Sequence, residues 1–452
     1  MRYRMRMFVL VYVLVFAGMM LFWWGPSKLH YGMYSTLQQG HSLRTVSIVR
    51  DVQAAGVAID DPAYGYDNYT SNFWNHSTAF CDGRFIGYSR LLAILRNVVL
   101  DFKFARGQKG GENISDVINQ PEEEEFYKYL PGFFKLPCKE PIEYNFIGDS
   151  HHLNSWIENA LETDGKVFSR EAGIYIDWTI AITRYEYANL YHTMTDYYNA
   201  FLMLKMFRLN SKDVTILIID GHPSGGLDAT WRYLFGKVKR VSDFRKPTLF
   251  KNMIWSMAGY ESPLDDHFLP NVPYIEEFRE FFLFHYDVSS SYKLNCKRLN
   301  ILLIWRHDYL AHPRNPSGKV SRKINNEFEL LSKMQETFRT HNVRGIQIDK
   351  YPMKKQLQMI AKTDILIGMH GAGLSHTLFL PKHSGLLEMF SMYYTAENRH
   401  FRAMAGWRGL HYRNWENMDY EREVMEESTN VDEAEVARLT VEISEQMCPK
   451  SS

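Results

Sequence analysis

The sequence predicts an α/β fold in which two Rossmann-like lobes face a cleft, preceded by one transmembrane signal-anchor helix. Two stretches of the chain alternate strand-like apolar runs with helix-like amphipathic runs, which is typical of a parallel sheet covered on both faces. One long uncharged apolar run lies near the N-terminus and predicts the anchor. The length of 452 residues agrees with two or three domains.

The predicted anchor extends from Met7 to Trp24 and, as a helix, spans roughly 27 Å, about the thickness of an early secretory membrane. Arginines at positions 2, 4 and 6 precede it, and the positive-inside rule keeps them in the cytosol. A cleaved signal peptide is the alternative, but tryptophans rather than small residues stand at the end of the run. We expect a cytosolic tail (1–6), an anchor (7–24) and a lumenal stem (25–64), as in a single-pass type II membrane protein.

The composition excludes several classes of protein. Lys+Arg and Asp+Glu both number 52, so the formal net charge is zero and a protein that coats nucleic acid is not expected. Hydrophobic residues make up 45% and charged residues 23%, which are ordinary proportions for globular domains. Only one apolar run is long enough to span a bilayer, so a multispanning membrane protein is excluded as well.

Two features agree with a lumenal location. Sequons for N-glycosylation occur at Asn68, Asn75 and Asn113. The four cysteines are too far apart for a CxxC motif, so disulfides are favoured in an oxidising lumen, with free buried thiols as the alternative. Of the three possible pairings we favour Cys81–Cys138 and Cys296–Cys448, because each pair then stays within one lobe or ties the C-terminal tail to it.

The first predicted lobe comprises residues 65–292. Its clearest strands are IYIDWTIAI (174–182) and VTILIID (214–220), separated by a long apolar-periodic helix that ends near Arg208 and followed by the helical run LDATWRYLFG. The acidic run at 122–125 follows a proline and is most simply a solvated loop or helix start, so we assign it no function.

The second predicted lobe comprises residues 293–425, and a closing helix and tail follow at 426–452. Its strands are LNILLIWR, VRGIQID, DILIGM and GLLEMF, and the helical runs NEFELLSKMQETFR and MKKQLQMIAK lie between them. The closing helix is predicted at 431–447 from its amphipathic pattern.

A glycine-rich turn, GMHGAGLSH, follows the strand DILIG and precedes a plausible helix. Ligands of open parallel sheets bind at the carboxyl ends of strands, and glycines let backbone N–H groups approach a phosphate. The turn is neither a Walker motif nor a GxGxxG fingerprint, so a plain strand-to-helix connection is the alternative. His370 within the turn is a candidate hydrogen-bond donor to a phosphate, and a structural histidine is the alternative.

Several cations follow the strand LNILLIWR, namely Arg306, Arg314, Lys319 and Arg322. Arginines that converge on a strand end can bind a phosphate, although a solvated basic loop is the alternative. Glu388 lies in the buried-looking run GLLEMF, where a carboxylate needs partners, and the hydroxyls of a ribose would serve.

A third candidate cluster lies in the first lobe. On one helix, Asn189, His192 and Asp196 would share a face, amid tyrosines and methionines. A histidine near a carboxylate is competent as a general base, and a hydrogen-bonded packing cluster is the alternative. No Asp-x-Asp motif occurs in the sequence, so cationic side chains rather than a metal would balance a diphosphate leaving group.

These motifs resemble glycosyltransferase family 61, and within it the plant-type core β1,2-xylosyltransferases. The resemblance covers about residues 185–414 and is carried by EYANLYHTMTDYYNAF, DGHPSGGLDATWRYLFG, RHDYLAHPRNPSGKVSRKINNE and DILIGMHGAGLSHTLFLP. The first and last blocks look family-wide and are shared with EGF-domain-specific O-linked GlcNAc transferases. The second and third look like the xylosyltransferase branch.

The resemblance implies a GT-B architecture and inverting transfer from a UDP-sugar in the Golgi lumen without an obligatory metal. The donor would be UDP-xylose, and the acceptor the core β-mannose of an N-glycan. Alternatives are an O-linked GlcNAc or other sugar transferase acting directly on protein, and an inactive lumenal binding protein of the same fold.

The resemblance also implies roles for residues of the candidate clusters. The catalytic base would be His192 or Asp196, with Asn189 also facing the acceptor. The UDP diphosphate would be held by Arg306, Arg322, His370, Gly371, Ala372 and Gly373, and the ribose by Glu388.

Overall fold

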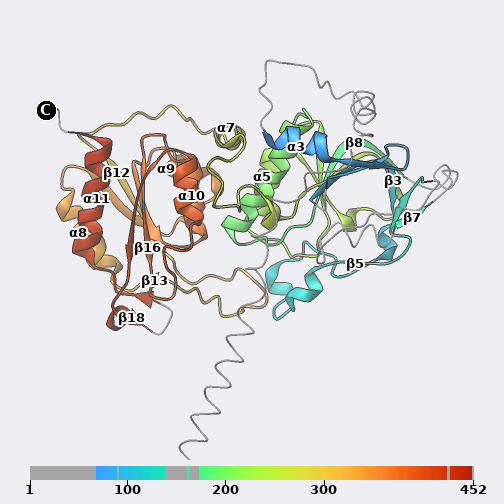
Figure 1. The fold of residues 1–452 in the computed structure, drawn as a ribbon. Coiled ribbons are helices and arrows are strands. Elements are labelled where there is room, and N and C mark those ends of the chain that lie inside the picture. Colours follow the sequence, from blue (N-terminus) through green and yellow to red (C-terminus); the bar gives the residue numbers. More distant parts are fainter. Residues whose placement is uncertain (1–67, 89–90, 139–159, 163–172, 425–427, 450–452) are drawn as a thin grey trace, which may run out of the picture. The chain divides into compact units, whose positions relative to one another are not determined.

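Two β-sheets organise the part of the chain that the computed structural model describes, which is residues 68–88, 91–138, 160–162, 173–424 and 428–449 (Figure 1). The helices of this part are α3 (Asn68–His76), α5 (Leu190–Met206), α6 (Asp228–Phe235), α7 (Ile275–His285), α8 (Glu327–Thr337), α9 (Met353–Ile360), α10 (His400–Trp407) and α11 (Glu433–Met447). The prediction of a mixed α/β fold is confirmed.

A five-stranded sheet forms the C-terminal part of the described chain. Its strands are β12 (Asn300–Ile304), β14 (Asn342–Ile346), β15 (Ile365–Met369), β16 (Gly385–Phe390) and β17 (His411–Glu416). They lie in the order β14-β12-β15-β16-β17, and every neighbouring pair is parallel. This is the doubly wound order 2-1-3-4-5, in which the chain direction across the sheet reverses between β12 and β15. Ligands of such sheets bind at the carboxyl ends of the strands beside that reversal.

Helices cover both faces of the five-stranded sheet, with α8 and α11 on one side and α9 and α10 on the other (Figure 1). Leu302 and Leu366 pack in the same buried cluster as residues of α9 and α10. Leu303 follows Leu302 on β12, and Ile365 precedes Leu366 on β15. Both pack instead with α8 and α11. Apolar residues that alternate between two covered faces explain why these strands read as continuous apolar runs in the sequence.

A nine-stranded mixed sheet forms the N-terminal part. Its strands are β1 (Thr78–Phe80), β2 (Phe85–Tyr88), β3 (Leu92–Leu100), β6 (Phe134–Leu136), β7 (Ala160–Glu162), β8 (Gly173–Ile182), β9 (Val214–Ile218), β10 (Lys237–Arg240) and β11 (Thr248–Trp255). Strands β10, β9, β8 and β11 lie side by side and are parallel, in the 3-2-1-4 order of a Rossmann half. The antiparallel strands β3, β2 and β1 then extend this core at its β11 edge.

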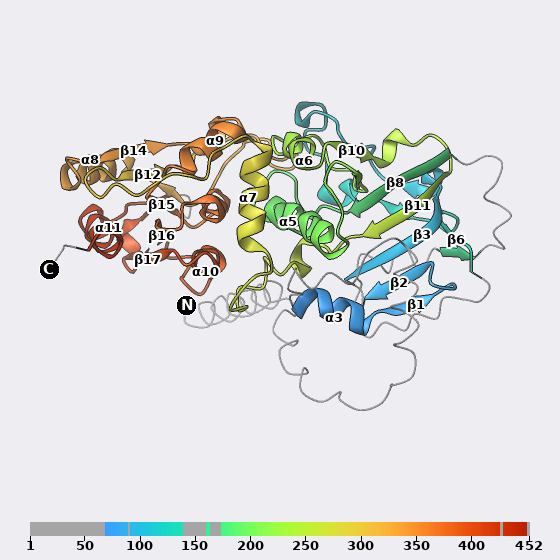
Figure 2. The same cartoon turned by 90° about the horizontal axis from the view of Figure 1, so that it is seen from above.

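The two faces of the nine-stranded sheet are covered differently. Helices α5, α6 and α7 pack on one face, in the cluster that contains Ile180 and Ile216 (Figure 2). The other face, which contains Leu217, packs against aromatic residues of the segment 102–138, among them Phe133 and Phe134. The expected Rossmann-like first lobe is therefore helical on one face and covered by short strands and turns on the other, which the sequence pattern did not reveal.

The helix expected after the glycine-rich turn is present as a 3-10 helix, η8 (Ala372–Phe379). Close packing explains why the turn is rich in glycine: a Cβ on Gly368 would lie 2.7 Å from Cγ1 of Ile304, and one on Gly373 would lie 3.1 Å from its Cδ1. These two glycines let η8 and β15 lie directly against β12.

The two disulfides confirm the pairing favoured from the sequence. Cys81 pairs with Cys138 across the edge of the nine-stranded sheet, with Cα atoms 4.6 Å apart. Cys296 pairs with Cys448, with Cα atoms 5.7 Å apart, and ties the end of α11 to the segment before β12. The closing helix expected at 431–447 is α11, which packs on α8 and the five-stranded sheet.

The N-terminal features predicted from the sequence lie outside the described residues, among them the run 7–24 and the stem. None of the described helices has the length and apolar character needed to cross a bilayer. Of the sequon residues, Asn75 and Asn113 are exposed, and Asn68 is the first residue of α3.

Candidate active site

The best candidate for a ligand site lies at the carboxyl ends of β12 and β15. Arg306 follows β12, and His370 and Gly371 directly follow β15. Because β12 and β15 are neighbouring parallel strands, their ends meet at the point where the sheet order reverses. A Cβ on Gly371 would collide with the guanidinium group of Arg306, so this arginine lies directly against the glycine-rich turn.

Arg306 and Arg322 bring two guanidinium groups to this strand end. Arg306 Nε donates to the backbone carbonyl of Ser321 at 3.0 Å, and the guanidinium of Arg322 lies over the ring of Tyr394, 4.3 Å from its centroid. Burial, followed by the nearby charge of Arg322, lowers the pKa of Arg306 to about 10. Among the described residues, no carboxylate pairs with either arginine. Two largely buried cations without a counter-ion form a site suited to an anion.

His370 contacts the same two arginines electrostatically and is held from behind by a buried carboxyl group. Its Nδ1 lies 2.6 Å from Oε1 of Glu388, and the hydroxyl of Tyr412 donates to Oε2 of Glu388 at 2.8 Å. Burial raises the pKa of Glu388 to about 8, whereas burial and the charges of Arg322 and Arg306 lower the pKa of His370 to about 3. Glu388 is 0% exposed, and both of its oxygens have protein partners rather than facing open space.

The three residues of the first-lobe cluster have different environments. Asn189 is the N-cap of α5, and its Oδ1 accepts a hydrogen bond from the Tyr191 backbone N–H at 3.0 Å. This bond gives Asn189 a structural role at the start of the helix, independent of any substrate. The remaining two residues, His192 and Asp196, lie four positions apart within α5.

His192 is half-buried in a ring of aromatic side chains. Its ring centroid lies 5.3 Å from that of Tyr185, 5.2 Å from that of Tyr191 and 5.4 Å from that of Tyr260. Burial lowers the pKa of His192 below the ordinary histidine value, so the imidazole is neutral at pH 7. A neutral, partly accessible imidazole can accept a proton from a substrate hydroxyl.

Asp196 is 0% exposed, and no side chain among the described residues hydrogen-bonds to its oxygens. Burial raises its pKa well above the ordinary range, although the nearby charge of Arg184 opposes this shift and the backbone of Tyr185 gives a minor stabilisation of the anion. Gly259 packs over it, since a Cβ there would lie 3.3 Å from Oδ1. The carboxyl group is thus sealed from solvent, and burial favours its protonated form.

The two predicted halves of the site meet through His400, at the start of α10. Its ring lies 5.4 Å from that of His370 and 4.8 Å from that of Tyr191. Burial and then the neighbouring His267, His370 and His192 lower the pKa of His400 to about 3. The glycine-rich turn and the N-terminal end of α5 therefore converge on one cluster of neutral imidazoles.

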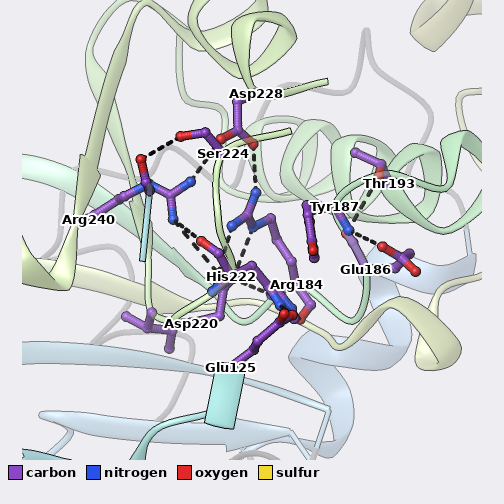
Figure 3. Close-up of polar contacts among 12 residues, drawn as sticks. Glu125, Arg184, Glu186, Tyr187, Thr193, Asp220, His222, Ser224, Asp228 and Arg240 are labelled. Atoms are coloured by element: carbon purple, nitrogen blue, oxygen red, sulfur yellow. Dashed lines mark hydrogen bonds and ion pairs between the residues drawn. The ribbon is translucent and has the colours of Figure 1, made fainter. Parts of the chain in front are cut away.

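A second polar cluster, not expected from the sequence, lies at the carboxyl ends of β8 and β9 (Figure 3). Arg184 is fully buried and forms a two-pronged pair with Asp220, Nε to Oδ2 at 3.0 Å and Nη2 to Oδ1 at 2.7 Å. Its Nη1 donates to Asp228 at 2.7 Å, and Arg240 reaches the other oxygen of Asp228 at 2.8 Å. The sequence signal that could have revealed this cluster is a charged residue shortly after each of the two buried strands.

The acidic run at 122–125 is not simply a solvated segment, as expected. It forms the 3-10 helix η3, and its last member, Glu125, is 1% exposed (Figure 3). Glu125 Oε2 lies 2.7 Å from Nδ1 of His222, and Nε2 of His222 lies 3.1 Å from the Arg184 carbonyl. A run of four identical residues conceals the single one that faces the interior, so the sequence pattern was misleading here.

The loop between Arg306 and Arg322 contacts the nine-stranded part through Glu186. Oε1 of Glu186 accepts from the backbone N–H groups of Tyr187 and Ala188, and Oε2 lies 3.2 Å from Nε2 of His312. Arg314 is placed by the same loop 2.9 Å from a carboxylate oxygen of Glu122. Arg314, predicted as a phosphate cation, thus has an acidic partner, in contrast to Arg306 and Arg322.

Comparison with known proteins assigns a family to this site. Residues 190–387 match the family model "Glycosyltransferase 61". The chain is 30% identical over 345 residues to the rice (Oryza sativa subsp. japonica) beta-1,2-xylosyltransferase RCN11, covering 67% of this chain and 63% of the rice protein. It is 26% identical over 375 residues to the Arabidopsis thaliana beta-1,2-xylosyltransferase, covering 67% of this chain and 69% of that protein.

A second group of relatives is named for a different activity. The EGF domain-specific O-linked N-acetylglucosamine transferase of Drosophila melanogaster is 28% identical over 248 residues, which is 51% of this chain and 44% of that protein. The chain thus spans between about two fifths and two thirds of the length of these curated relatives. The region matched by the glycosyltransferase 61 model contains α5, the loop between Arg306 and Arg322, and the glycine-rich turn.

Proposed function

We propose that this protein is an inverting glycosyltransferase that moves xylose from UDP-xylose to the core β-mannose of N-glycans in a β1,2 linkage. The observation that carries the proposal is the pair of arginines, without a carboxylate partner among the described residues, beside the glycine-rich turn at the reversal of the five-stranded sheet. The two plant xylosyltransferases match over two thirds of the chain and support the choice of sugar.

In this mechanism Arg306 and Arg322 bind the diphosphate and stabilise the negative charge that develops on UDP as it leaves. His370 adds a hydrogen bond to the same oxygens. Because these groups supply the positive charge, we expect no obligatory metal ion.

His192 is our candidate for the base. Inversion needs a single base that removes the proton of the attacking hydroxyl on the face opposite the leaving group. His192 is neutral and partly accessible, whereas Asp196 is fully buried and its pKa is raised well above the ordinary aspartate value. We infer that Asp196 has a structural role in the packing of α5 and that Asn189 caps the N-terminus of this helix.

The proposal includes a GT-B arrangement of the two sheets and a Golgi location as a type II membrane protein, with residues 1–6 cytosolic. The sequons and the two disulfides support exposure to the secretory lumen.

The test is a donor and acceptor screen with the purified chain in EDTA. We expect UDP-xylose to add one pentose to a GlcNAc-terminated N-glycan, detected by mass spectrometry, with inversion seen in the anomeric proton coupling. Transfer from UDP-GlcNAc but not from UDP-xylose would contradict the donor assignment.

The second candidate is an O-linked GlcNAc transferase that acts directly on protein, and the EGF domain-specific relatives favour it. It predicts transfer from UDP-GlcNAc to a folded EGF domain and no transfer to free N-glycans. Running both acceptors in the same screen separates the two candidates.

Arg306→Ala tests whether the site binds nucleotide at all. The loss of a charge-assisted contact to phosphate costs about 1.5–3 kcal/mol, so we expect UDP affinity to fall roughly 10–100-fold in calorimetry. Arg339→Ala is the matched control, because its side chain is 77% exposed and outside the site. Equal UDP affinity in both variants would mean that Arg306 does not bind the nucleotide, and no UDP binding in wild type would support an inactive binding protein of this fold.

A further inference from the structure

Glu388 is a candidate residue whose surroundings differ from the role expected for it. A carboxylate that binds ribose must present at least one oxygen to the ligand, but Glu388 is 0% exposed. Its Oε1 faces His370 Nδ1 at 2.6 Å and its Oε2 accepts from the Tyr412 hydroxyl at 2.8 Å. All three groups lie on the neighbouring strands β15, β16 and β17 or directly after them.

His370 shows the complementary pattern. One ring nitrogen, Nδ1, is bound to Glu388, and among the described residues Nε2 has no hydrogen-bond partner. Its side chain keeps 7% exposure, and Arg306 and Arg322 lie close enough to affect its charge. The nitrogen that remains available is therefore the one that can meet an anion held by these two arginines.

We propose that Glu388, in its protonated form, donates a hydrogen bond to Nδ1 of His370 and thereby holds His370 as an Nε2–H donor to the diphosphate. This inference rests on the proposed function, because it takes UDP-sugar as the ligand of the same site. Glu388 is then a positioning residue that acts through His370, and Tyr412 supports it from the other oxygen.

The proton inventory fixes what happens when Glu388 ionises. Below its pKa of about 8 the pair holds two protons, one on the carboxyl group and one on Nε2. Loss of one proton leaves a carboxylate, and the remaining imidazole proton moves to Nδ1 to donate to it. Nε2 then carries a lone pair, which repels a phosphate oxygen instead of donating to it.

Several titratable groups around the pair do not change charge near pH 8. His400 and His267 have pKa values lowered to about 3 and about 4, and Arg306 stays cationic to about 10. Burial raises the pKa of Tyr412 out of the range, and the remaining neighbours are Arg322, Tyr394, Arg402 and Glu416. A transition of UDP affinity near pH 8 is therefore assigned to Glu388.

Three variants of the full chain test the proposal by UDP titration calorimetry between pH 6.5 and 9. Wild type should lose roughly tenfold in affinity as the pH rises through about 8. Glu388→Gln should bind like wild type at pH 7 within about threefold and lack the transition, since an amide donates to Nδ1 and accepts from Tyr412 at every pH. Glu388→Ala should bind at least about tenfold more weakly at pH 7.

Tyr412→Phe provides a test that a purely structural role would not pass. The tyrosine hydroxyl stabilises the ionised carboxylate, so its removal should raise the pKa of Glu388 and move the transition to higher pH. An unchanged midpoint in Tyr412→Phe, or a retained transition in Glu388→Gln, would overturn the proposal.

Inorganic pyrophosphate separates this role from ribose binding. If Glu388 acts through His370, Glu388→Ala weakens pyrophosphate and UDP by the same factor. If Glu388 holds the ribose, pyrophosphate affinity is unchanged and the proposal fails.

Nitrogen chemical shifts of His370, assigned with His370→Asn, should show a protonated Nε2 in the UDP complex at pH 7. Absence of UDP binding in wild type would instead refute the proposed function. Thermal melts of each variant identify a loss of binding that is due to misfolding.

Discussion

At the scale of single residues, the sequence indicated the chemical role of the candidate residues better than it indicated how deeply each side chain is buried. The resemblance implied that Arg306, Arg322 and His370 bind one diphosphate, and in the structure the charges of both arginines act on His370. Helical spacing put His192 and Asp196 on one helix but could not show that Gly259, from a distant segment, seals the carboxyl group. Burial by residues far apart in the chain has no local sequence signal.

Substitution of His192 and Asp196 distinguishes a base from a buried support. We expect His192→Ala to lower turnover by roughly 100-fold or more with UDP affinity unchanged, because general base catalysis contributes about 10²–10⁴-fold. The wild-type rate should fall at acid pH, with a midpoint below 6.5, as the imidazole becomes protonated. Steady-state kinetics against pH check both points. Asp196→Asn, in contrast, should retain activity within about tenfold.

The raised pKa of Asp196 has a defined effect on stability. As the pH rises above the ordinary aspartate range, the unfolded chain loses this proton while the folded protein keeps it, so stability falls until the folded-state pKa is reached. Asp196→Asn removes this loss. Its melting temperature should therefore exceed that of wild type at pH 7, and the two should converge near pH 4. If Asp196→Asn is less stable than wild type at pH 7 but not at pH 4, the Asp196 carboxylate is ionised beside Arg184 in the folded protein.

At the scale of elements, most strands and helices were predictable. Strands β12, β15 and β16 are buried on both faces, so their apolar runs were unambiguous. The helix expected after the glycine-rich turn is present as the 3-10 helix η8, a type that the sequence did not specify. Covering of the nine-stranded sheet by 102–138 was missed, since its strands are only two or three residues long.

Gly371→Ala tests the close approach of the turn to the arginine. The added methyl group would occupy the position of the Arg306 guanidinium and displace it, so we expect UDP affinity to fall at least about tenfold with the fold retained. Gly406→Ala is the control: nothing lies within 4 Å of its Cβ position, and it is within α10. That variant should bind UDP normally and gain about 0.4–1 kcal/mol in stability, measured by chemical denaturation.

At the scale of the whole molecule, alternation of strands and helices correctly predicted two sheets but not their differences. The five-stranded sheet has the complete doubly wound order, whereas the nine-stranded sheet joins a four-stranded parallel core to antiparallel strands. The disulfide pairing was favoured correctly because each bond remains near one sheet. Strand order itself has no direct sequence signature and required the structure.

The two disulfides should stabilise the protein unequally. Cys296 and Cys448 are separated by 152 residues, and Cys81 and Cys138 by 57. Loop-closure entropy predicts a contribution of about 2–5 kcal/mol from each, larger by about 1 kcal/mol for the longer loop. Paired Cys→Ser variants, compared by denaturant unfolding, check the order. A larger loss from removing Cys81–Cys138 would contradict the entropic argument.

The reversal of strand order between β12 and β15 also governs when the protein becomes competent during its synthesis. Ile304 pairs with Gly368, so the two strand ends that carry Arg306 and His370 meet only after the intervening β14 and α9 have been made and folded. Pairing over such a sequence distance is slow, because the chain entropy is lost before the contacts form. Under the proposed function, we therefore expect UDP binding to appear only after β15 has been made and paired with β12, and retention on immobilised UDP would select chains that have formed this pairing.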